Sequence, residues 1–230
     1  MNNNNNNNNI LINQKVGFKG NKILLKPGIK LTEDFIDKIR QMNAGKPNFT
    51  VYTQRVRETF GLDPITINEN RKTFLAGFIE GEGSVSISLK KNKNARYGIE
   101  LDPLFNITQH INGVNHLYVA LEVFQTGRIR YKAGSNATLV FIIEPRKSIQ
   151  QKVCPFMEKY VYPFSSPAKQ VRYENFKKML DLFDAEAHLD RNKLVDELLP
   201  LWDIMRMQQG YEGQTFKTLL EAQDFVRNLK

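Results

Sequence analysis

The stretch LAGFIEGEG, residues 75–83, is the part of the sequence that decides the fold. Gly77 and Gly81 stand four residues apart, so on a helix they share one face. A face without bulky side chains lets a second helix backbone approach very closely. Gly81 and Gly83 also supply the backbone freedom that ends a helix. We therefore expect a helix that begins near Asn70, ends at Gly81 and packs closely against a second helix.

Two carboxylates stand at the end of this expected helix. Glu80 and Glu82 occupy its last turn, where the helix dipole is already negative, so their charge opposes helix stability. A bound cation would offset that charge, because hard divalent metals prefer carboxylate oxygens. The pattern predicts a divalent-metal site, although spacing alone leaves solvated helix-end carboxylates as an equal alternative.

The composition favours a polyanionic partner. The chain has 230 residues, a formal net charge of +9 and a pI near 9.5, which indicates nucleic acid before a membrane surface. Plain solubility is the other interpretation of this charge. No apolar run reaches the roughly 20 residues of a membrane span, so we expect no membrane partner. Cys154 is the only cysteine, which excludes a disulfide framework and a cysteine-based zinc site.

The sequence divides into three expected parts. Residues 1–9 are a methionine and eight asparagines without the pattern of a signal peptide, and we interpret them as a disordered leader, native or artefactual. Residues 10–68 predict a basic, mostly helical extension, with lysines at 15, 19, 22, 26 and 30 in an irregular arm. Two short helices follow the arm, the first N-capped by Thr32 and the second between Asn48 and Gly61. Residues 69–230 are the expected core domain with its C-terminal helices.

The core predicts an α+β fold. Alternating apolar and polar residues indicate strands at 84–90, 98–110, 127–132 and 136–144, with a helix at 114–125 between the two pairs. Further helices are expected at 148–160, 166–187, 191–209 and 218–229. The order helix, two strands, helix, two strands, helix predicts a four-stranded antiparallel sheet with helices on one face.

The other face of this sheet is polar and basic. Its mixture of arginine, lysine, amide and hydroxyl side chains suits phosphates and base edges, although a plain solvated face stays open from the alternation alone. A twisted strand ribbon fits the major groove of DNA, which is about 12 Å wide. The hairpin tip around residues 90–96 adds cations that we expect to meet phosphates. The predicted nucleic-acid-binding residues are Ser86, Ser88, Lys90, Lys93, Arg96, Asp102, Asn106, Thr108, Arg128, Arg130, Lys132, Asn136 and Thr138.

With motif, sheet and charge together, the chain resembles the LAGLIDADG homing endonucleases. Residues 75–83 match the family motif with glutamate at both acidic positions, and collinear matches run from about residue 20 to the C-terminus. They include the stretches ILLKPGIKL (23–31), FNITQH (105–110), LEVFQTGRIR (121–130), GSNATLV (134–140), SSPAK (165–169) and EAQDF (221–225).

The resemblance implies a homodimer that packs its motif helices at a two-fold axis and lays each sheet in the major groove of double-stranded DNA. Such an enzyme cleaves both strands of a long, pseudo-palindromic site and leaves short 3′ overhangs. It uses Mg²⁺, for which Ca²⁺ or Mn²⁺ can substitute in binding or cleavage, and it has no small-molecule substrate. The resemblance further implies a target in a large-subunit ribosomal RNA gene and an organellar location, in the chloroplast or alternatively the mitochondrion.

The resemblance also implies roles for individual residues. Glu82 matches the metal-ligand position of the motif, and Gln109 matches the position that orients solvent around the metal. Lys169 is the candidate for a third, basic catalytic residue, with Arg172 beside it, although the spacing here departs from that of related enzymes. Glu80 matches a structural position that caps or braces the partner helix. The expected dimer-interface residues are Phe74, Gly77, Phe78, Glu80 and Gly81.

Two other functions stay open at this stage. An RNA-binding maturase that assists intron splicing would keep the fold and the basic surface without needing the carboxylate. A DNA-binding relative without catalysis would do the same. The presence of both Glu82 and Gln109 favours the nuclease.

Overall fold

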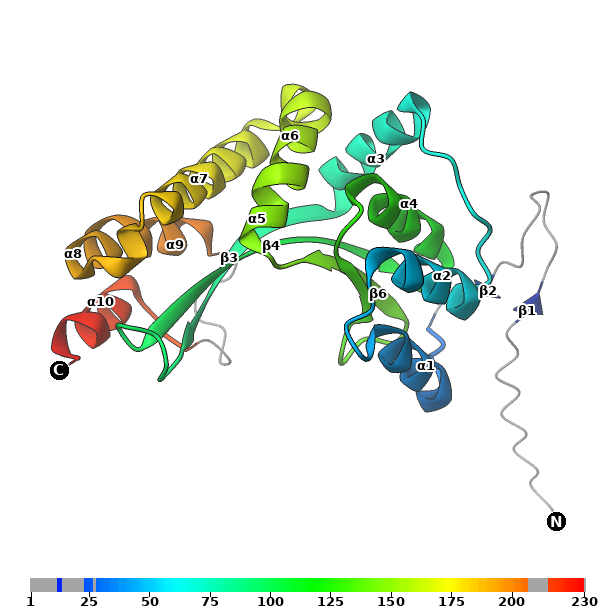
Figure 1. The fold of residues 1–230 in the computed structure, drawn as a ribbon, viewed down its shortest axis with the longest axis horizontal. Helices are drawn as coiled ribbons and strands as arrows, with labels where there is room; N and C mark the ends of the chain where they lie inside the picture. The colour runs from blue at the N-terminus through cyan, green and yellow to red at the C-terminus, as the bar shows by residue number, and fades with distance from the viewer. Residues whose placement is uncertain (1–11, 14–22, 27, 207–214, 230) are drawn as a thin grey trace, which may run out of the picture. The chain divides into compact units, whose positions relative to one another are not determined.

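The structure is a computed structural model that describes residues 12–13, 23–26, 28–206 and 215–229 (Figure 1). The leader at residues 1–9 and the lysines at 15, 19 and 22 lie outside these residues, so the predictions made for them stay predictions. The backbone forms two compact units. The first contains Met1–Leu75 and Ile107–Ile142, and the second contains Ala76–Asn106 and Ile143–Lys230. The proposed division at residues 9 and 68 also stays a prediction.

The N-terminal part of the first unit holds two capped helices. The short strands β1 (Ile12–Asn13) and β2 (Ile23–Leu24) pair antiparallel ahead of them. Helix α1 (Glu33–Asn43) begins where the Thr32 side chain accepts a hydrogen bond from the Phe35 amide. Helix α2 (Phe49–Phe60) begins with the same kind of cap from Asn48 and ends at Gly61 in the left-handed conformation. Both helices lie where the sequence predicts them.

Helix α3 (Glu69–Glu82) carries the motif and leads directly into strand β3 (Gly83–Lys91). The prediction that this helix ends at Gly81 is wrong by one residue. Space rather than backbone freedom sets the boundary, because a Cβ at Gly83 would lie 2.7 Å from the carbonyl oxygen of Ile79. A Cβ at Gly81 would meet nothing within 4 Å. Gly83 is therefore the residue that the turn from helix to strand requires.

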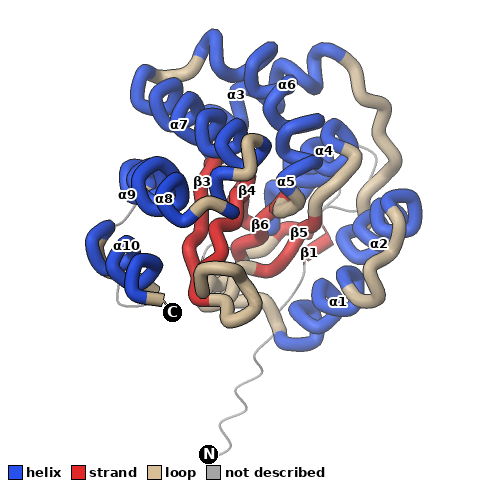
Figure 2. Tube along the Cα trace, turned by 60° about the vertical axis from the view of Figure 1, so that its left-hand side comes forward, coloured by secondary structure: helices blue, strands red, loops and turns tan. Residues whose placement is uncertain are grey.

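Four strands form the main sheet in the order β3-β4-β6-β5 (Figure 2). They are β3, β4 (Ile99–His110), β5 (Arg128–Tyr131) and β6 (Thr138–Ile143). Strands β5 and β6 are antiparallel, with Arg130 opposite Val140. In β3 and β4 the apolar residues are buried except Leu104, which is half-buried, and the polar residues are half-buried or exposed, as the alternation predicts. The α+β fold predicted from the sequence is confirmed. Pro103 lies within β4, which is an inner strand between β3 and β6.

Helix α4 (Val114–Phe124) follows a short 3₁₀ turn, η1 (Ile111–Gly113), and packs within the first unit. Its apolar face is buried, and Phe124 stacks on Phe141 of β6 with the ring centroids 6.1 Å apart. Helix α2 contacts α4, and α1 contacts β5. The Tyr52 hydroxyl joins α2 to the sheet, because it accepts a hydrogen bond of 2.7 Å from the Ile129 amide.

The helices of the second unit follow strand β6. The helical run from 146 to 164 comprises α5 (Arg146–Ser148), η2 (Ile149–Val153), α6 (Cys154–Phe156), η3 (Met157–Val161) and η4 (Tyr162–Phe164). Then come α7 (Pro167–Asp184), η5 (Ala187–Leu189), α8 (Arg191–Lys193), η6 (Leu194–Leu198), α9 (Leu199–Met205) and α10 (Leu219–Asn228). Helices α7 and α9 pack against β3. Across the described ranges, no helix is long and apolar enough to cross a membrane.

Three segments of these helices have π geometry, where the sequence predicts regular helices. Segments η2, η3 and η6 each end two residues before a proline, namely Pro155, Pro163 and Pro200. A proline has no N–H group, so the carbonyl four residues before it loses its helical hydrogen bond. That carbonyl lies at the centre of each π segment. The local change to wider turns therefore follows from the prolines.

Candidate active site

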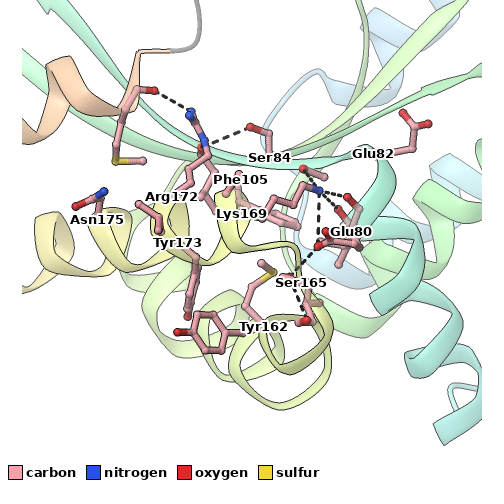
Figure 3. A pocket seen from close by; sticks show the side chains of 18 of the residues that line it. Glu80, Glu82, Ser84, Phe105, Tyr162, Ser165, Lys169, Arg172, Tyr173 and Asn175 are labelled. Atoms are coloured by element: carbon pink, nitrogen blue, oxygen red, sulfur yellow. Dashed lines mark hydrogen bonds and ion pairs between the residues drawn. The ribbon is translucent and has the colours of Figure 1, made fainter.

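A cavity of about 580 Å³ lies in the second unit beside the C-terminal end of α3 (Figure 3). The last turn of α3 and the start of β3 form one wall, and α7 with the η3 and η4 turns forms another. Its lining contains four charged residues, Glu80, Glu82, Lys169 and Arg172, together with apolar side chains such as Met157 and Ile204. The cavity thus brings the motif together with the segment 165–172 from which the sequence predicts a basic residue.

Both carboxylate oxygens of Glu80 accept hydrogen bonds within the subunit. The Ser165 hydroxyl donates to Oε2 at 2.7 Å, and the Ser166 amide donates to Oε1 at 3.1 Å. Burial alone would raise the pKa of Glu80, but these hydrogen bonds and the nearby charge of Lys169 outweigh it and lower the pKa. The sequence predicts that Glu80 braces a partner helix. In the structure its carboxylate braces the start of α7 in its own chain, and its contact with a partner helix stays a prediction.

The Lys169 ammonium lies against the carbonyl oxygens at the end of α3. Its Nζ donates to the carbonyls of Ile79 at 3.1 Å and Gly83 at 3.4 Å, and most closely to that of Glu80. It also lies 3.9 Å from Oε2 of Glu80. Burial lowers the pKa of Lys169, although the charges of Glu80 and Glu82 oppose this effect. The cation therefore occupies the position where the last helical carbonyls lack partners.

Arg172 is the other basic residue that the sequence places here. Its Nε donates to the carbonyl of Val85 at 2.8 Å, and one Nη donates to the carbonyl of Met205 at 2.9 Å. Burial lowers the pKa of Arg172. Arg172 thus ties α7 to β3 and to the end of α9, which gives it a structural role that the sequence does not predict.

Glu82 differs from Glu80 in its surroundings. It is the last residue of α3, its side chain is exposed, and Figure 3 shows it pointing away from the cluster of Glu80, Ser165 and Lys169. In the part of the chain that the structure describes, no group of three or more His, Cys, Asp or Glu residues could hold a metal ion. One carboxylate nevertheless fits Mg²⁺, which keeps several waters and is usually held by one or two carboxylates and substrate phosphates.

Gln109 and His110 end strand β4 and belong to the first unit, whereas Glu82 belongs to the second. The Gln109 Oε1 accepts a hydrogen bond of 2.7 Å from the amide of His110. The His110 Nδ1 accepts one of 3.2 Å from the amide of Asn112 and so caps the 3₁₀ turn η1. His110 therefore has a structural task, and the catalytic role of Gln109 stays a prediction.

One face of α3 is bare, as the glycine spacing predicts. A Cβ at Gly77 or Gly81 would meet nothing within 4 Å. Phe74, one turn before Gly77, is 52% exposed and has its ring centroid 5.1 Å from that of His116. Phe78 is half-buried on the same face. An exposed phenylalanine beside two exposed glycines makes a surface that a second helix can cover.

The predicted nucleic-acid-binding residues are all exposed or half-buried, so the predicted polar face exists. Two of them already have partners in this face. Lys90 lies 2.6 Å from Asp102 and 3.4 Å from Glu100. Its hydrogen bond to Asp102 raises the pKa of Lys90. Phosphate binding by Lys90 would thus compete with two carboxylates, whereas Lys93 and Arg96 at the hairpin tip are exposed.

Arg128 is less accessible than Arg130, although the two share the parity of strand β5. The Arg128 guanidinium lies 4.2 Å from the Tyr52 ring centroid and donates to the carbonyl of Pro47 at 3.1 Å. Burial raises the pKa of Tyr52 to about 12, which keeps this phenol neutral. Arg130 is exposed. Sequence alternation places both arginines on one face but cannot detect that α2 holds one of them.

Ser165 and Arg191 are two residues to which the sequence analysis assigns no role. Ser165 holds Glu80, and its position just before the Ser166-Pro167 helix start is the only sequence signal for it. The Arg191 guanidinium lies 5.3 Å from the ring of Tyr97, and that of Arg96 lies 5.5 Å from the same ring. No local pattern joins Arg191 to the hairpin tip, because the contact depends on the packing of the C-terminal helices.

Comparison with known proteins identifies the family. A model of the LAGLIDADG endonucleases matches residues 75–180. The DNA endonuclease I-CeuI of Chlamydomonas moewusii is 49% identical over 213 residues, which are 91% of this chain and 98% of that protein. The structure of the group I intron-encoded homing endonuclease I-CeuI complexed with DNA has a TM-score of 0.85 and 49% identity, and the match covers 89% of this chain and 100% of that one.

A more distant archaeal structure agrees. The intron-encoded homing endonuclease I-Vdi141I complexed with DNA has a TM-score of 0.59 and 28% identity, over 69% of this chain and 96% of that one. The family that the sequence resembles is thus confirmed over nearly the whole length of a relative. This chain belongs to the LAGLIDADG homing endonucleases, enzymes that cleave DNA.

Proposed function

We propose that two copies of this chain form a symmetric homodimer that breaks both strands of a long, imperfectly palindromic DNA site and leaves short 3′ overhangs. A symmetric dimer presents the same surface twice, so it suits a site made of two related half-sites. The bare face of α3 around Gly77 and Gly81 supports this arrangement. The DNA complexes of the two relatives support double-stranded DNA as the partner.

The observation that carries the proposal is the difference between the two acids of the motif. Glu80 is bound by Ser165, Ser166 and Lys169, whereas Glu82 is exposed at the end of the bare helix. When two α3 helices pack through their glycine faces, each delivers its Glu82 close to the two-fold axis. Glu82 is therefore our assignment for the metal ligand, and Glu80 for a structural role.

Dependence on a divalent metal is typical of this family. We propose Mg²⁺, with Glu82 as a ligand, and expect Ca²⁺ or Mn²⁺ to substitute in binding or cleavage. When bound, such a metal activates water and neutralises charge on the phosphate. Gln109 is proposed to orient the attacking water through its amide, which can both donate and accept hydrogen bonds. The basic sheet face holds the DNA, with Arg130, Lys132 and the hairpin tip as its most accessible cations.

The proposed target is a large-subunit ribosomal RNA gene. The proposed location is the chloroplast, with the mitochondrion as the alternative. Both proposals rest on family resemblance and on the relative from Chlamydomonas moewusii. A cleavage screen against an intron-less fragment of that gene tests the target. Specific double-strand breaks at one position are expected, and cleavage at no position in the fragment would reject this target.

Glu82→Gln tests the assignment of the metal ligand. Plasmid cleavage in Mg²⁺ is expected to disappear while DNA binding in Ca²⁺ persists, because the amide keeps the shape but loses the charge. Glu58→Gln, an exposed glutamate on α2, is the matched control and should cleave normally. Unchanged cleavage by Glu82→Gln would contradict the assignment, and RNA binding without DNA cleavage by the unmodified protein would favour a maturase.

A further inference from the structure

We propose that Lys169 is a positioning residue for Glu82 and does not exchange protons with the DNA. In this role Lys169 fixes the last turn of α3 and so sets where the Glu82 carboxylate lies. The proposal rests on the function proposed above, in which Glu82 binds the metal.

The hydrogen bonds of Lys169 account for its whole donor capacity. A lysine ammonium has three N–H donors and no acceptor. Here the three carbonyls of Ile79, Glu80 and Gly83 lie within hydrogen-bonding distance of Nζ. An ammonium directed at three carbonyls has no proton left for a leaving oxygen.

A second contact strengthens the hold on the helix end. Glu80 extends from the last turn of α3 to Ser165 and to the Ser166 amide, at the N-terminus of α7. Lys169 extends from the first turn of α7 to the C-terminus of α3. Each side chain therefore places its charge at the end of the other helix where the dipole is opposite in sign. We call the contacts of Glu80, Ser165, Ser166 and Lys169 the helix-end clasp.

The helix-end clasp holds the backbone on both sides of Glu82, the proposed metal ligand. Glu82 lies between Glu80 and Gly83, and Lys169 is bonded to the carbonyls of these two residues, which are two positions before Glu82 and one after it. Gly83 has no free space on its inner side, because a Cβ there would meet Ile79. The backbone on either side of Glu82 is thus fixed, while its side chain stays exposed. Outer-shell partners of this kind are typically worth about 10- to 100-fold in metal affinity or activity.

Replacing Lys169 by Met and by Arg separates positioning from proton transfer. In Lys169→Met, the Mg²⁺ concentration for half-maximal cleavage is expected to rise about 10-fold or more. The shape of the pH profile at saturating Mg²⁺ should stay that of the unmodified protein. Lys169→Arg should recover most of the activity, because a guanidinium can donate to the same carbonyls but cannot act as a base at any pH of the assay.

One measurement does not depend on cleavage. Hydrogen–deuterium exchange without metal is expected to become faster in residues 79–84 of Lys169→Met. Ser165→Ala, which removes one part of the clasp and leaves Lys169 in place, should also raise the Mg²⁺ requirement, by a smaller factor. Lys177→Met is the matched control, because Lys177 is on the same helix and pairs with Glu158. It should leave the Mg²⁺ requirement and the exchange of residues 79–84 unchanged.

The outcomes distinguish this inference from the proposed function. The inference would be overturned if the cleavage rate of Lys169→Met no longer rose or fell with pH where that of the unmodified protein does, while Ser165→Ala kept a normal Mg²⁺ requirement. That result would show that Lys169 is catalytic. Normal cleavage and normal exchange in both variants would also overturn it, even if Glu82→Gln is inactive. Normal cleavage by Glu82→Gln would instead overturn the role of Glu82 on which the inference rests.

Discussion

Glu80 and Lys169 each stabilise the end of the other's helix, although they lie 89 residues apart in the sequence. Glu80 lies in the last turn of α3 and accepts hydrogen bonds at the start of α7, while Lys169 lies in the first turn of α7 and donates to carbonyls at the end of α3. This relationship explains how a helix can end in two glutamates. One negative charge is neutralised within the subunit, and the other is that of the exposed Glu82, the proposed metal ligand.

Ser165→Ala should lower the free energy of unfolding by about 1 kcal/mol. Hydrogen bonds to a charged group are worth roughly 1.5–3 kcal/mol, and partial exposure of Glu80 reduces this value. Urea unfolding of the metal-free protein measures the change. In a double-mutant cycle with Glu80→Ala, the two effects should be less than additive, because each single change removes the same hydrogen bond. Full additivity would mean that the bond contributes nothing.

If the proposed dimer packs through α3, Gly77→Leu should give a monomer without unfolding the subunit. A Cβ at Gly77 meets nothing within 4 Å in the subunit, and leucine favours a helix more than glycine does. A second α3 helix could no longer approach closely. Sedimentation velocity measures the mass, with Lys38→Leu on the exposed face of α1 as the control. A stable dimer of Gly77→Leu would show that the subunits pack through another surface.

Arg128→Ala and Arg130→Ala should have different effects although the residues share a strand face. Arg128 stacks on Tyr52 and bonds to Pro47, so its removal should destabilise the fold by about 1 kcal/mol. Arg130 is more exposed than Arg128, so its removal should weaken DNA binding and lower the melting temperature less than removal of Arg128 does. Thermal melting and DNA titration on both variants check this. Equal melting temperatures would contradict the structural role of Arg128.

His188 should make the protein less stable as the pH falls below neutral. Burial and then the charge of Arg146 lower the pKa of His188, so the unfolded chain binds its proton more readily than the folded one. The stabilising contribution is complete above the ordinary histidine pKa of about 6.5 and is lost as the pH falls through the folded pKa. Melting temperatures from pH 8 to pH 5 should therefore fall less steeply in His188→Gln. Parallel curves would rule out this contribution.

The local parts of the fold could be predicted from the sequence because their causes are local. Thr32 and Asn48 cap their helices through amides three residues away, and strand alternation assigns each side chain to a face. The end of α3 could not be predicted, because the motif has glycines at positions 77, 81 and 83 and each could end a helix. Only the contact with Ile79 shows that the chain leaves the helix at Gly83. The π segments could not be predicted either, although the prolines that cause them can be read from the sequence.

The candidate site shows the same limit. The motif and its likeness to a family point to Glu82 directly, but the helix-end clasp joins segments that are 85 to 90 residues apart. No sequence periodicity connects Lys169 with Ile79. The sequence also cannot distinguish a lysine that caps a helix from a lysine that takes part in catalysis. Arg128 is the parallel case in the first unit, since its contact with Tyr52 depends on the packing of α2 beside β5.

The strength of DNA binding should depend steeply on salt, and specific cations should account for the slope. Each phosphate that a side chain neutralises contributes about 0.9 to the slope of log K against log salt. Lys93, Arg96 and Lys132 are exposed, whereas Lys90 is paired with Asp102. The triple change Lys93→Ala, Arg96→Ala and Lys132→Ala should thus reduce the slope by about 2 to 3 per subunit. Lys90→Ala alone should reduce it by less than about 0.9, because Asp102 and Glu100 compete for its charge.

DNA titration in Ca²⁺ at several salt concentrations measures the slopes of the unmodified protein, of the triple variant and of Lys90→Ala. Equal reductions per lysine would show that DNA displaces the carboxylates from Lys90, and a flat response would reject phosphate binding by the hairpin tip.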